Sequence, residues 1–456
     1  MNKKTYLLLI AMSLLPLIFL RDFTTNNELR YLSIADEAIR NGTFFTFTNH
    51  GIPYADKPPL YLWFVMLGKW LLGSHQMWFL SLFSLAPAFI IVGTMNKWVK
   101  RELNEPYVSL ATLMLMSCGL FLGLSVFIRM DMLMCMFITL ALYKFYKIYE
   151  GKAQKIDSFL FAIYVFMAVF SKGAIGFLVP LISTITFLII KKDYRLIGKI
   201  WSWKTFAIIL ILCGLWFTGI LVEGGNEYLN NLLYHQTVDR AIDSFHHKEP
   251  FYYYFISMWY SMAPWTILFV YLLFKSFIKK WFFSDKEVFF FTVIATTFIM
   301  LSLISSKIAV YLLPVFPFIA YLSVLLIKNI NWKNHTIKII NRSTLALFSI
   351  IFVCSIFIVP NVNKSVSYRS LCERAVEVSI EEKTDGFCSY EIKRAENLDV
   401  FLGEQIDIIT FDELINQKNK VLLLNNKTIE NEPKLKKFIS DKKQYIIDKN
   451  SVIILQ

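Results

Sequence analysis

Eleven runs of predominantly apolar residues lie within the first 360 positions of this 456-residue chain. A helix of about 20 apolar residues crosses the roughly 30 Å hydrocarbon core of a bilayer, and most of the runs approach that length. They lie near residues 5–20, 76–95, 107–127, 131–148, 158–170, 174–190, 205–222, 252–274, 288–304, 308–327 and 343–360. Because only 18% of the residues are charged, against about a quarter in soluble proteins, we expect an all-α polytopic membrane protein with about 11 spans.

The basic residues between these runs predict the orientation of the chain. The first run follows Lys3 and Lys4, and no small-residue cleavage site follows it, so we interpret it as a retained span. With a cytoplasmic N-terminus, the cytoplasmic segments carry 22 lysines and arginines and the short outward segments carry about ten. This bias is the positive-inside pattern, and with eleven spans it places the C-terminal region outside the cell membrane. It also accounts for the net charge of +13 without a nucleic-acid partner.

Two outward loops are long, namely residues 21–75 and 223–250. Within the first, Glu28–Arg40 has the spacing of an amphipathic helix that ends at Asn41-Gly42. A second apolar stretch, Pro58–Gly73, is 16 residues long and starts with two prolines. A true span there would invert the basic bias of every later loop, so we expect a helix that lies in the membrane interface.

The chain changes character after residue 360, where it becomes polar and mixed in charge. We therefore divide it into a transmembrane domain, 1–360, and a small extracytoplasmic α/β domain, 361–456. Strand-like runs lie at 406–410, 421–425, 445–447 and 452–455, and helical stretches lie near 370–382 and 433–441. Cys372 and Cys388 both fall in this region, and an oxidising compartment would allow a disulfide between them. The other cysteines are expected to be core residues of spans: Cys118, Cys135, Cys213 and Cys354.

Polar and ionisable residues cluster at six places on the outward side of the predicted bundle. Ionisable residues at or inside a span are costly and usually functional. The six places are Asn27-Glu28-Leu29-Arg30-Tyr31, Asp56-Lys57-Pro58-Pro59, Arg129-Met130-Asp131, Ser171-Lys172-Gly173, His246-His247-Lys248-Glu249-Pro250, and Ser305-Ser306-Lys307 followed by Tyr311. Each has a structural explanation when taken alone. Arg129, Lys172 and Lys307 could be interfacial anchors, and the two histidines could be ordinary loop residues.

Taken together, the six clusters bring cations and carboxylates to one face of the membrane. Lysines and arginines near the interface suit an anionic phosphate ligand. A carboxylate among them suits a general base that deprotonates an acceptor hydroxyl or amine. A lipid-phosphate donor would enter sideways from the bilayer. We therefore expect group transfer at the outer membrane–water interface.

At these residues the chain resembles the polyprenyl-phosphate-dependent glycosyltransferases of the membrane-embedded GT-C class. It is most similar to the bacterial lipid A aminoarabinose transferase group, and more distantly to protein O-mannosyltransferases. The similarity runs from about residue 1 to 325, in order and with plausible spacing. The matching stretches are 27–31, 51–60, 129–131, 171–176, 247–253, and Lys307 through Tyr311-Leu312-Leu313-Pro314. No single motif is specific, whereas the set of six is fairly strong.

The resemblance implies an inverting transfer of a sugar from an undecaprenyl-phosphate-type donor, in the bacterial inner membrane, to an acceptor such as lipid A, another envelope glycan or a protein. The family has an acidic pair in the first outward loop, and its Asp is taken as the base. Here that position is Asn27, whose amide cannot accept the proton. Glu28 therefore becomes the first candidate base and Asp131 the second. We expect Glu28→Gln or Asp131→Asn to abolish transfer in a protein that still folds.

The resemblance also implies a set of residues around the lipid phosphate. Lys57, Lys172, Lys307 and Tyr311 match positions expected to hold it, with Arg30 nearby. The wider substrate-binding set adds Asn27, Tyr54, Arg129 and His246. Some family members place a metal at the positions of Asp56 and His247. A zinc ion is thus one expectation, although two ligands are few for zinc and the family usually has Glu at the first position.

Two other functions are weighed against the transferase. A transporter or flippase of a lipid-linked or anionic solute usually shows internal repeats and polar residues at the bilayer midplane, and the sequence has neither. A structural subunit of an envelope complex would use the C-terminal domain as its working part, which predicts that 361–456 alone keep the activity. The sequence leaves the sugar and the acceptor open.

Overall fold

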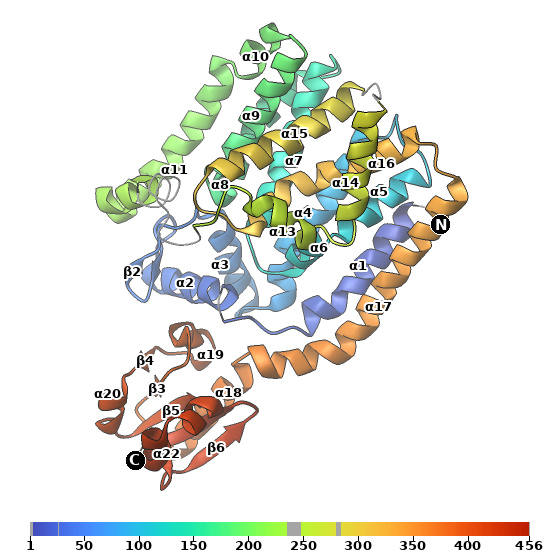
Figure 1. Cartoon of the computed structure of the whole chain (residues 1–456). Helices are drawn as coiled ribbons and strands as arrows, with labels where there is room; N and C mark the ends of the chain where they lie inside the picture. Colours follow the sequence, from blue (N-terminus) through green and yellow to red (C-terminus); the bar gives the residue numbers. More distant parts are fainter. Residues whose placement is uncertain (1–2, 26, 235–247, 280–283, 456) are drawn as a thin grey trace.

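The computed structural model describes residues 3–25, 27–234, 248–279 and 284–455 (Figure 1). Most of the chain forms a helical bundle, and a small mixed α/β region follows it at the C-terminus. The bundle helices are α1 (Lys3–Phe19), α4 (Met77–Trp98), α5 (Tyr107–Met116), α6 (Gly119–Val126), α7 (Asp131–Tyr149), α8 (Lys155–Lys172), α9 (Ile175–Ile190), α10 (Tyr194–Ile200), α11 (Trp203–Asn230), α13 (Tyr253–Ser261), α14 (Thr266–Ile278), α15 (Asp285–Leu303), the 3-10 helix η2 (Ala309–Val315), α16 (Phe316–Asn329) and α17 (Asn334–Val366).

Among the described residues, six helices are long and apolar enough to cross a membrane. Two bent pairs, α5 with α6 at 68° and α13 with α14 at 119°, raise this number to eight if each pair forms one span. Every predicted apolar run is helical, and the three remaining runs correspond to α1, α8 and α9. The chain is therefore a multi-span membrane protein, as predicted, and the count of 11 spans stays a prediction.

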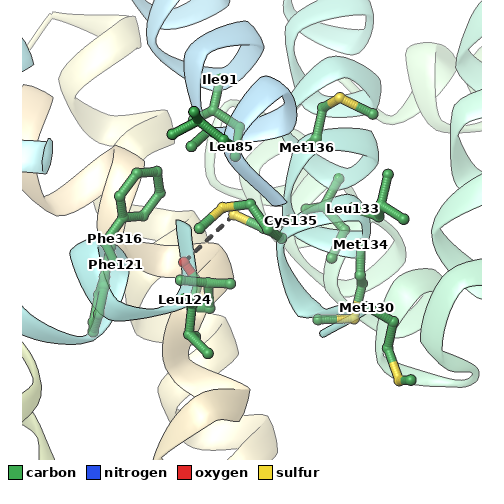
Figure 2. Close-up of a cluster of buried hydrophobic side chains, with 14 of the residues drawn as sticks. Leu85, Ile91, Phe121, Leu124, Met130, Leu133, Met134, Cys135, Met136 and Phe316 are labelled. Carbon is green, nitrogen blue, oxygen red and sulfur yellow. Dashed lines mark hydrogen bonds between the residues drawn. The ribbon is translucent and has the colours of Figure 1, made fainter. Parts of the chain in front are cut away.

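A tightly packed apolar core holds α7 against its neighbours. Figure 2 shows Leu85 and Ile91 of α4, Phe121 and Leu124 of α6, and Phe316 of α16 around the first turns of α7. Cys135 of α7 also donates a hydrogen bond to the carbonyl oxygen of Leu313 at 3.6 Å. Because lipid is as apolar as these side chains, close packing rather than the hydrophobic effect stabilises such helix contacts. The packing fixes the start of α7, where Asp131 lies.

The first and last helices of the bundle pack side by side, although they are far apart in sequence (Figure 1). Their contact includes Asn363 near the end of α17, whose side-chain amide donates to the Leu20 carbonyl at 2.7 Å. The same side chain accepts a hydrogen bond from the Asp22 backbone N–H at 3.1 Å. The end of α1 and the start of the first long loop are thus fixed to the last bundle helix.

The first long loop forms the two helices that the sequence predicts. They are α2 (Glu28–Asn41) and α3 (Leu60–Leu72), joined through the short hairpin β1 (Thr48–Asn49) and β2 (Ile52–Pro53). Gly42, with φ 68°, ends α2 in the left-handed conformation that glycine favours. Glu37 of α2 fixes the hairpin, because its carboxylate accepts hydrogen bonds from the backbone N–H groups of His50 and Gly51 at 2.6 and 2.9 Å. With 13 residues α3 is about 20 Å long, which is too short for a span.

The C-terminal region contains a five-stranded sheet of order β4-β3-β5-β7-β6. Its elements are α18 (Arg369–Glu382), β3 (Phe387–Ser389), the 3-10 helix η3 (Ala395–Leu398), α19 (Asp399–Leu402), β4 (Ile406–Ile408), α20 (Phe411–Ile415), β5 (Lys420–Asn425), α21 (Asn426–Asn431), α22 (Pro433–Ile439), β6 (Gln444–Ile447) and β7 (Asn450–Leu455). β3 pairs in parallel with β4 and β5, whereas β7 pairs antiparallel with β5 and β6. Four strands and two helices lie where predicted, and β3 is an additional strand. Cys372 and Cys388 are free, buried thiols.

The C-terminal region contacts the first long loop at one end of the bundle (Figure 1). Ser33 of α2 donates a hydrogen bond to Asp399 of α19 at 3.0 Å. Arg369 of α18 lies 3.5 Å from the Asp22 carboxylate, and its guanidinium is 5.4 Å from the centre of the Phe401 ring. The helix α17 continues to Val366 and leads directly into this region. The division of the chain at residue 361 stays a prediction.

Candidate functional site

A cavity of about 310 Å³ lies at the end of the bundle that carries the first long loop. Four of the predicted site residues line it: Asp56, Lys57, Lys172 and Tyr311. Much of the remaining wall is apolar and comes from α8, α9, α11, the residues after α11 and the connection after α15, through Val169, Ile175, Trp216, Phe217, Leu232, Leu233 and Ile304. The cavity can therefore accept a ligand with an anionic head and an apolar chain.

Lys172 is the last residue of α8, and its side chain is only 4% exposed. The ammonium pairs with the carboxylate of Asp131 on α7 and lies 4.7 Å from the centre of the Tyr311 ring. The chain turns sharply after it, with Gly173 at φ 90°. A side chain at Gly176 would overlap the carbonyl group of Ala168, so glycine there allows α9 to start against α8. The two glycines thus position Lys172 at the rim of the cavity.

Asp131 begins α7, and its carboxylate is 1% exposed. One oxygen pairs with Lys172, and the other accepts a hydrogen bond from Nε of Arg129 at 2.9 Å. The N-terminal end of α7 adds the positive end of the helix dipole. Both carboxylate oxygens are therefore held by cations, and the direct consequence is that Asp131 fixes Lys172 and Arg129 in place.

Glu28 lies in the first turn of α2 and is 1% exposed. Its carboxylate accepts two hydrogen bonds from the guanidinium of Arg21, at 2.6 and 2.8 Å. It also accepts from the Thr24 backbone N–H and hydroxyl, both at 2.9 Å, and from the Ile128 backbone N–H at 3.0 Å. Glu28 is not among the residues that line the cavity. These contacts fasten the first loop to the connection between α6 and α7.

Three other predicted residues lie together near the N-terminal end of α2, and they do not line the cavity. Arg30 donates a hydrogen bond to the side-chain oxygen of Asn27 at 3.2 Å. Its guanidinium lies 5.5 Å from the centre of the Tyr54 ring. The structure therefore brings Asn27, Arg30 and Tyr54 into one group beside the Asp56–Pro58 segment.

Lys307 lies in the connection between α15 and η2, directly after the cavity residue Ser306. Its ammonium donates a hydrogen bond to the carbonyl oxygen of Glu249 at 2.9 Å. Lys248 and Ser306 form an isolated antiparallel bridge, so the end of the second long loop runs beside this connection. Burial lowers the pKa of Lys307, and the negative charge of Glu249 acts in the opposite direction. The predicted residues His246 and His247 lie outside the described part of the chain.

Two residues of α11 that the sequence patterns did not indicate hold the first loop against the cavity. Glu223 accepts hydrogen bonds from the consecutive backbone N–H groups of residues 44, 45 and 46 at 2.8, 2.7 and 2.9 Å. Tyr228 donates to the Tyr54 carbonyl at 2.8 Å. The one signal for Glu223 was a carboxylate directly after an apolar span.

Among the described residues, no group of three or more His, Cys, Asp and Glu side chains is arranged so that it could hold a metal ion. Asp56 brings a single carboxylate to the cavity, and one protein ligand is too few for zinc. The second predicted ligand, His247, lies outside the described residues. The zinc site therefore stays a prediction.

Comparison of sequences relates this chain to several known proteins. A family model described as Dolichyl-phosphate-mannose-protein mannosyltransferase matches residues 56–217. An uncharacterized protein of Aquifex aeolicus is 24% identical over 336 residues, which cover 72% of this chain and 64% of that protein. The undecaprenyl phosphate-alpha-4-amino-4-deoxy-L-arabinose arabinosyl transferase of Yersinia pestis is 25% identical over 301 residues, which cover 63% of this chain and 52% of that protein. The chain thus matches less than two thirds of the length of these curated relatives.

Two crystal structures of ArnT from Cupriavidus metallidurans are similar to this structure. The one bound to undecaprenyl phosphate aligns with a TM-score of 0.77 and 14% identity, covering 99% of this chain and 98% of that chain. The apo structure aligns with a TM-score of 0.75 and 14% identity, covering 99% and 97%. At this identity the similarity concerns the fold. It includes the C-terminal region, because almost the whole of both chains is covered.

Proposed function

We propose that this chain transfers a sugar from a polyprenyl-phosphate donor to an acceptor at the outer face of the bacterial inner membrane. The chain resembles the GT-C membrane glycosyltransferases of the aminoarabinose-transferase and protein-mannosyltransferase type. The observation that carries the proposal is the cavity in which Lys57, Lys172 and Tyr311 meet an apolar wall. A polyprenyl phosphate has the matching chemistry, an anionic head on an apolar chain. The acceptor is an envelope glycolipid such as lipid A, another envelope glycan or a protein.

The two cavity lysines take the donor phosphate in this proposal. Lysine ammonium groups bind phosphate through charge-assisted hydrogen bonds. The first isoprene units lie against the apolar wall from α11, which includes Trp216 and Phe217. Lys307 adds a buried cation close to the cavity, beside Ser306.

The transfer inverts the anomeric carbon. An oxygen or nitrogen of the acceptor attacks that carbon from the side opposite the phosphate, and the bond between the carbon and the phosphate oxygen breaks. The attacking group gives its proton to a carboxylate base, for which the sequence predicts Glu28 or Asp131. The bonding electron pair leaves with the polyprenyl phosphate, and the lysines stabilise the charge that develops on it. In this scheme Asp131 is a positioning residue for Lys172 and Arg129. That Glu28 or Asp131 is the base stays a prediction, and their contacts favour structural roles for both.

Mass spectrometry of envelope lipids and glycans, with and without the gene, tests the proposal. We expect loss of the gene to remove the mass of one sugar from one envelope component. The wild-type chain should restore that mass, and Lys172→Gln should not. Lys144→Gln is a matched control, because Lys144 forms a similar pair with the fully buried Asp157 at the other end of the same two helices, at 2.5 Å. An unchanged envelope in the deletion strain would contradict the proposal.

Binding of undecaprenyl phosphate to the purified chain provides a second measurement. A ligand present at 100 times its Kd stabilises a protein by about 2.7 kcal/mol, which a thermal unfolding scan detects. We expect this stabilisation in the wild-type chain and a much smaller one in Lys172→Gln. A flippase would also bind the lipid, but the purified chain would then move no sugar to an acceptor fraction extracted from the deletion strain.

A further inference from the structure

A second cavity, of about 400 Å³, lies where the C-terminal end of α3 meets the C-terminal region. Its lining comes from the segment after α1, from the end of α3 and the connection between α3 and α4, and from α18 and α19. The lining residues are Phe23, Lys69, Gly73, Ser74, His75, Gln76, Arg369, Val400 and Phe401. None of the functions predicted from the sequence involves this cavity.

The ionisable side chains of this lining can donate hydrogen bonds, and they come from two parts of the chain. Lys69 and His75 come from the first loop, and Arg369 comes from the C-terminal region. No carboxylate occurs among the described lining residues. The acidic residues lie behind these donors. Asp36 is 2.6 Å from Lys69 Nζ and 2.7 Å from His75 Nε2, and Asp22 is 3.5 Å from Arg369 Nε. These pairs hold the donors in position and leave the cavity wall itself without an anion.

One ring nitrogen of His75 is hydrogen-bonded to Asp36, and the other has no partner among the described residues. Its side chain is 5% exposed, and Nδ1 has no hydrogen-bond partner among the residues that the structure describes. When protonated, the imidazole can donate from both nitrogens, one to Asp36 and one to a ligand. A buried polar atom without a partner costs free energy. A phosphate in the cavity would relieve that cost in either state of the ring, because the neutral Nδ1 accepts from a P–OH group and the protonated Nδ1 donates to a phosphate oxygen.

Two further features favour an anion in this cavity. The 22-residue helix α4 begins at Met77, and its N-cap residue Gln76, which lines the cavity, makes no capping hydrogen bond with its side chain. The N-terminal end of a helix attracts negative charge. The guanidinium of Arg369 lies 6.0 Å from the Phe23 ring centre, so stacking as well as charge fixes its position.

The neighbouring face of α3 indicates what carries the anion. Leu67, Trp70 and Leu71 lie on one face of the helix and are 38%, 57% and 65% exposed. This apolar face ends beside Lys69 and the cavity. An apolar strip next to a donor-lined cavity matches a membrane lipid, with its acyl chains along the strip and its headgroup in the cavity.

We propose that this cavity is a second phosphate site, which binds the headgroup phosphate of a membrane lipid whose acyl chains lie along the exposed face of α3. The other end of α3 follows the Asp56–Pro58 segment of the first cavity. The two phosphate sites are therefore about 20 Å apart, the length of a 13-residue helix. The lipid would contact both the first loop and the C-terminal region. This site goes beyond the proposed transferase activity and does not depend on it.

Thermal unfolding of the purified full-length chain in detergent tests the site. The probe is dihexanoyl phosphatidic acid, compared with dihexanoylglycerol, which lacks the phosphate, and with inorganic phosphate, which lacks the chains. We expect saturable stabilisation by phosphatidic acid alone. Arg369→Gln should weaken its apparent affinity at least tenfold. Arg374→Gln should leave the affinity unchanged, because that arginine pairs with Glu377 on the same helix and does not line the cavity.

Several outcomes would overturn the proposal. Equal stabilisation by dihexanoylglycerol would show that the phosphate is not recognised, and equal stabilisation by inorganic phosphate would refute the lipid. Unchanged affinity in Arg369→Gln would refute the cavity as the site. If that variant fails to fold, His75→Gln provides the same test from the other wall. Lys172→Gln, which removes a lysine of the first cavity, should keep the phosphatidic acid response, so failure of the proposed transferase activity and failure of this site are distinguishable.

Discussion

Replacing Glu28 by Gln is expected to destabilise the protein, because the structure gives this carboxylate five donors and almost no exposure. A glutamine keeps one acceptor oxygen and turns an NH₂ group toward the guanidinium of Arg21. The arginine side chain is 11% exposed and would lose its counter-charge. The substitution therefore removes one partner of a buried ion pair.

The size of the effect follows from that geometry. Removing one partner of a buried pair costs about 3–5 kcal/mol, because the remaining charge stays buried and unpaired. At about 2 °C per kcal/mol for a chain of a few hundred residues, the Tm should fall by on the order of 6–10 °C. The double variant Arg21→Gln/Glu28→Gln removes both charges and should be more stable than the sum of the single changes predicts, by at least about 1 kcal/mol.

The assay is thermal unfolding of the four purified chains in detergent, together with the sugar-transfer measurement in cells. The anchoring role predicts that transfer falls in proportion to the amount of folded protein. A Glu28→Gln chain with the wild-type Tm and no transfer would refute this reasoning, and it would support the role of Glu28 as the base that the sequence predicts.

Three other substitutions test separate features. Asp131→Asn should lower transfer at least about tenfold per amount of folded protein and should also lower the Tm, because it removes the counter-charge that positions the buried Lys172; wild-type transfer would contradict the arrangement. Gly176→Ala should cost about 1–3 kcal/mol through overlap with the Ala168 carbonyl, whereas Gly198→Ala, which meets open space inside α10, should not lower the Tm. For Asp36, burial raises the pKa, but the hydrogen bonds and charges of His75 and Lys69 outweigh burial and hold the pKa below its usual value. A depressed carboxylate pKa stabilises the fold above about pH 4 and loses that contribution as the pH falls through the folded-state value, so the Tm difference between wild type and Asp36→Asn should shrink below pH 4.

The bundle could be predicted because each helix is encoded within its own stretch of sequence. A run of apolar residues whose helical length approaches the bilayer thickness predicts a helix without any knowledge of its packing partners. The two helices of the first loop were also predictable, α2 from its amphipathic spacing and α3 from its short apolar run. The strand β3 was not, because three buried residues, Phe387 to Ser389, show no alternation that separates a strand from a helix.

The sequence predicted several residues of the candidate site but not the contacts that hold them in place. The motifs that contain Lys57, Lys172 and Tyr311 predicted that these residues lie together, and all three line one cavity. The five donors to Glu28 could not be foreseen, because one of them, the Ile128 N–H, lies 100 residues away in the chain. The same holds for Glu223, whose partners lie about 180 residues earlier. Such contacts depend on how the spans pack, which sequence patterns do not encode.

The pairing of α1 with α17 has a consequence for how the chain is made. Asn363 and the Leu20 carbonyl that it binds are separated by 343 positions. At about 5–20 residues per second, a ribosome needs roughly 20 to 70 seconds to synthesise the stretch between them. During that time α1 has already left the ribosome but lacks the last neighbour against which it packs. A chain that stops before α17 would leave that face of α1 open to lipid and to quality-control proteases, so completion of synthesis is itself a condition for closing the bundle.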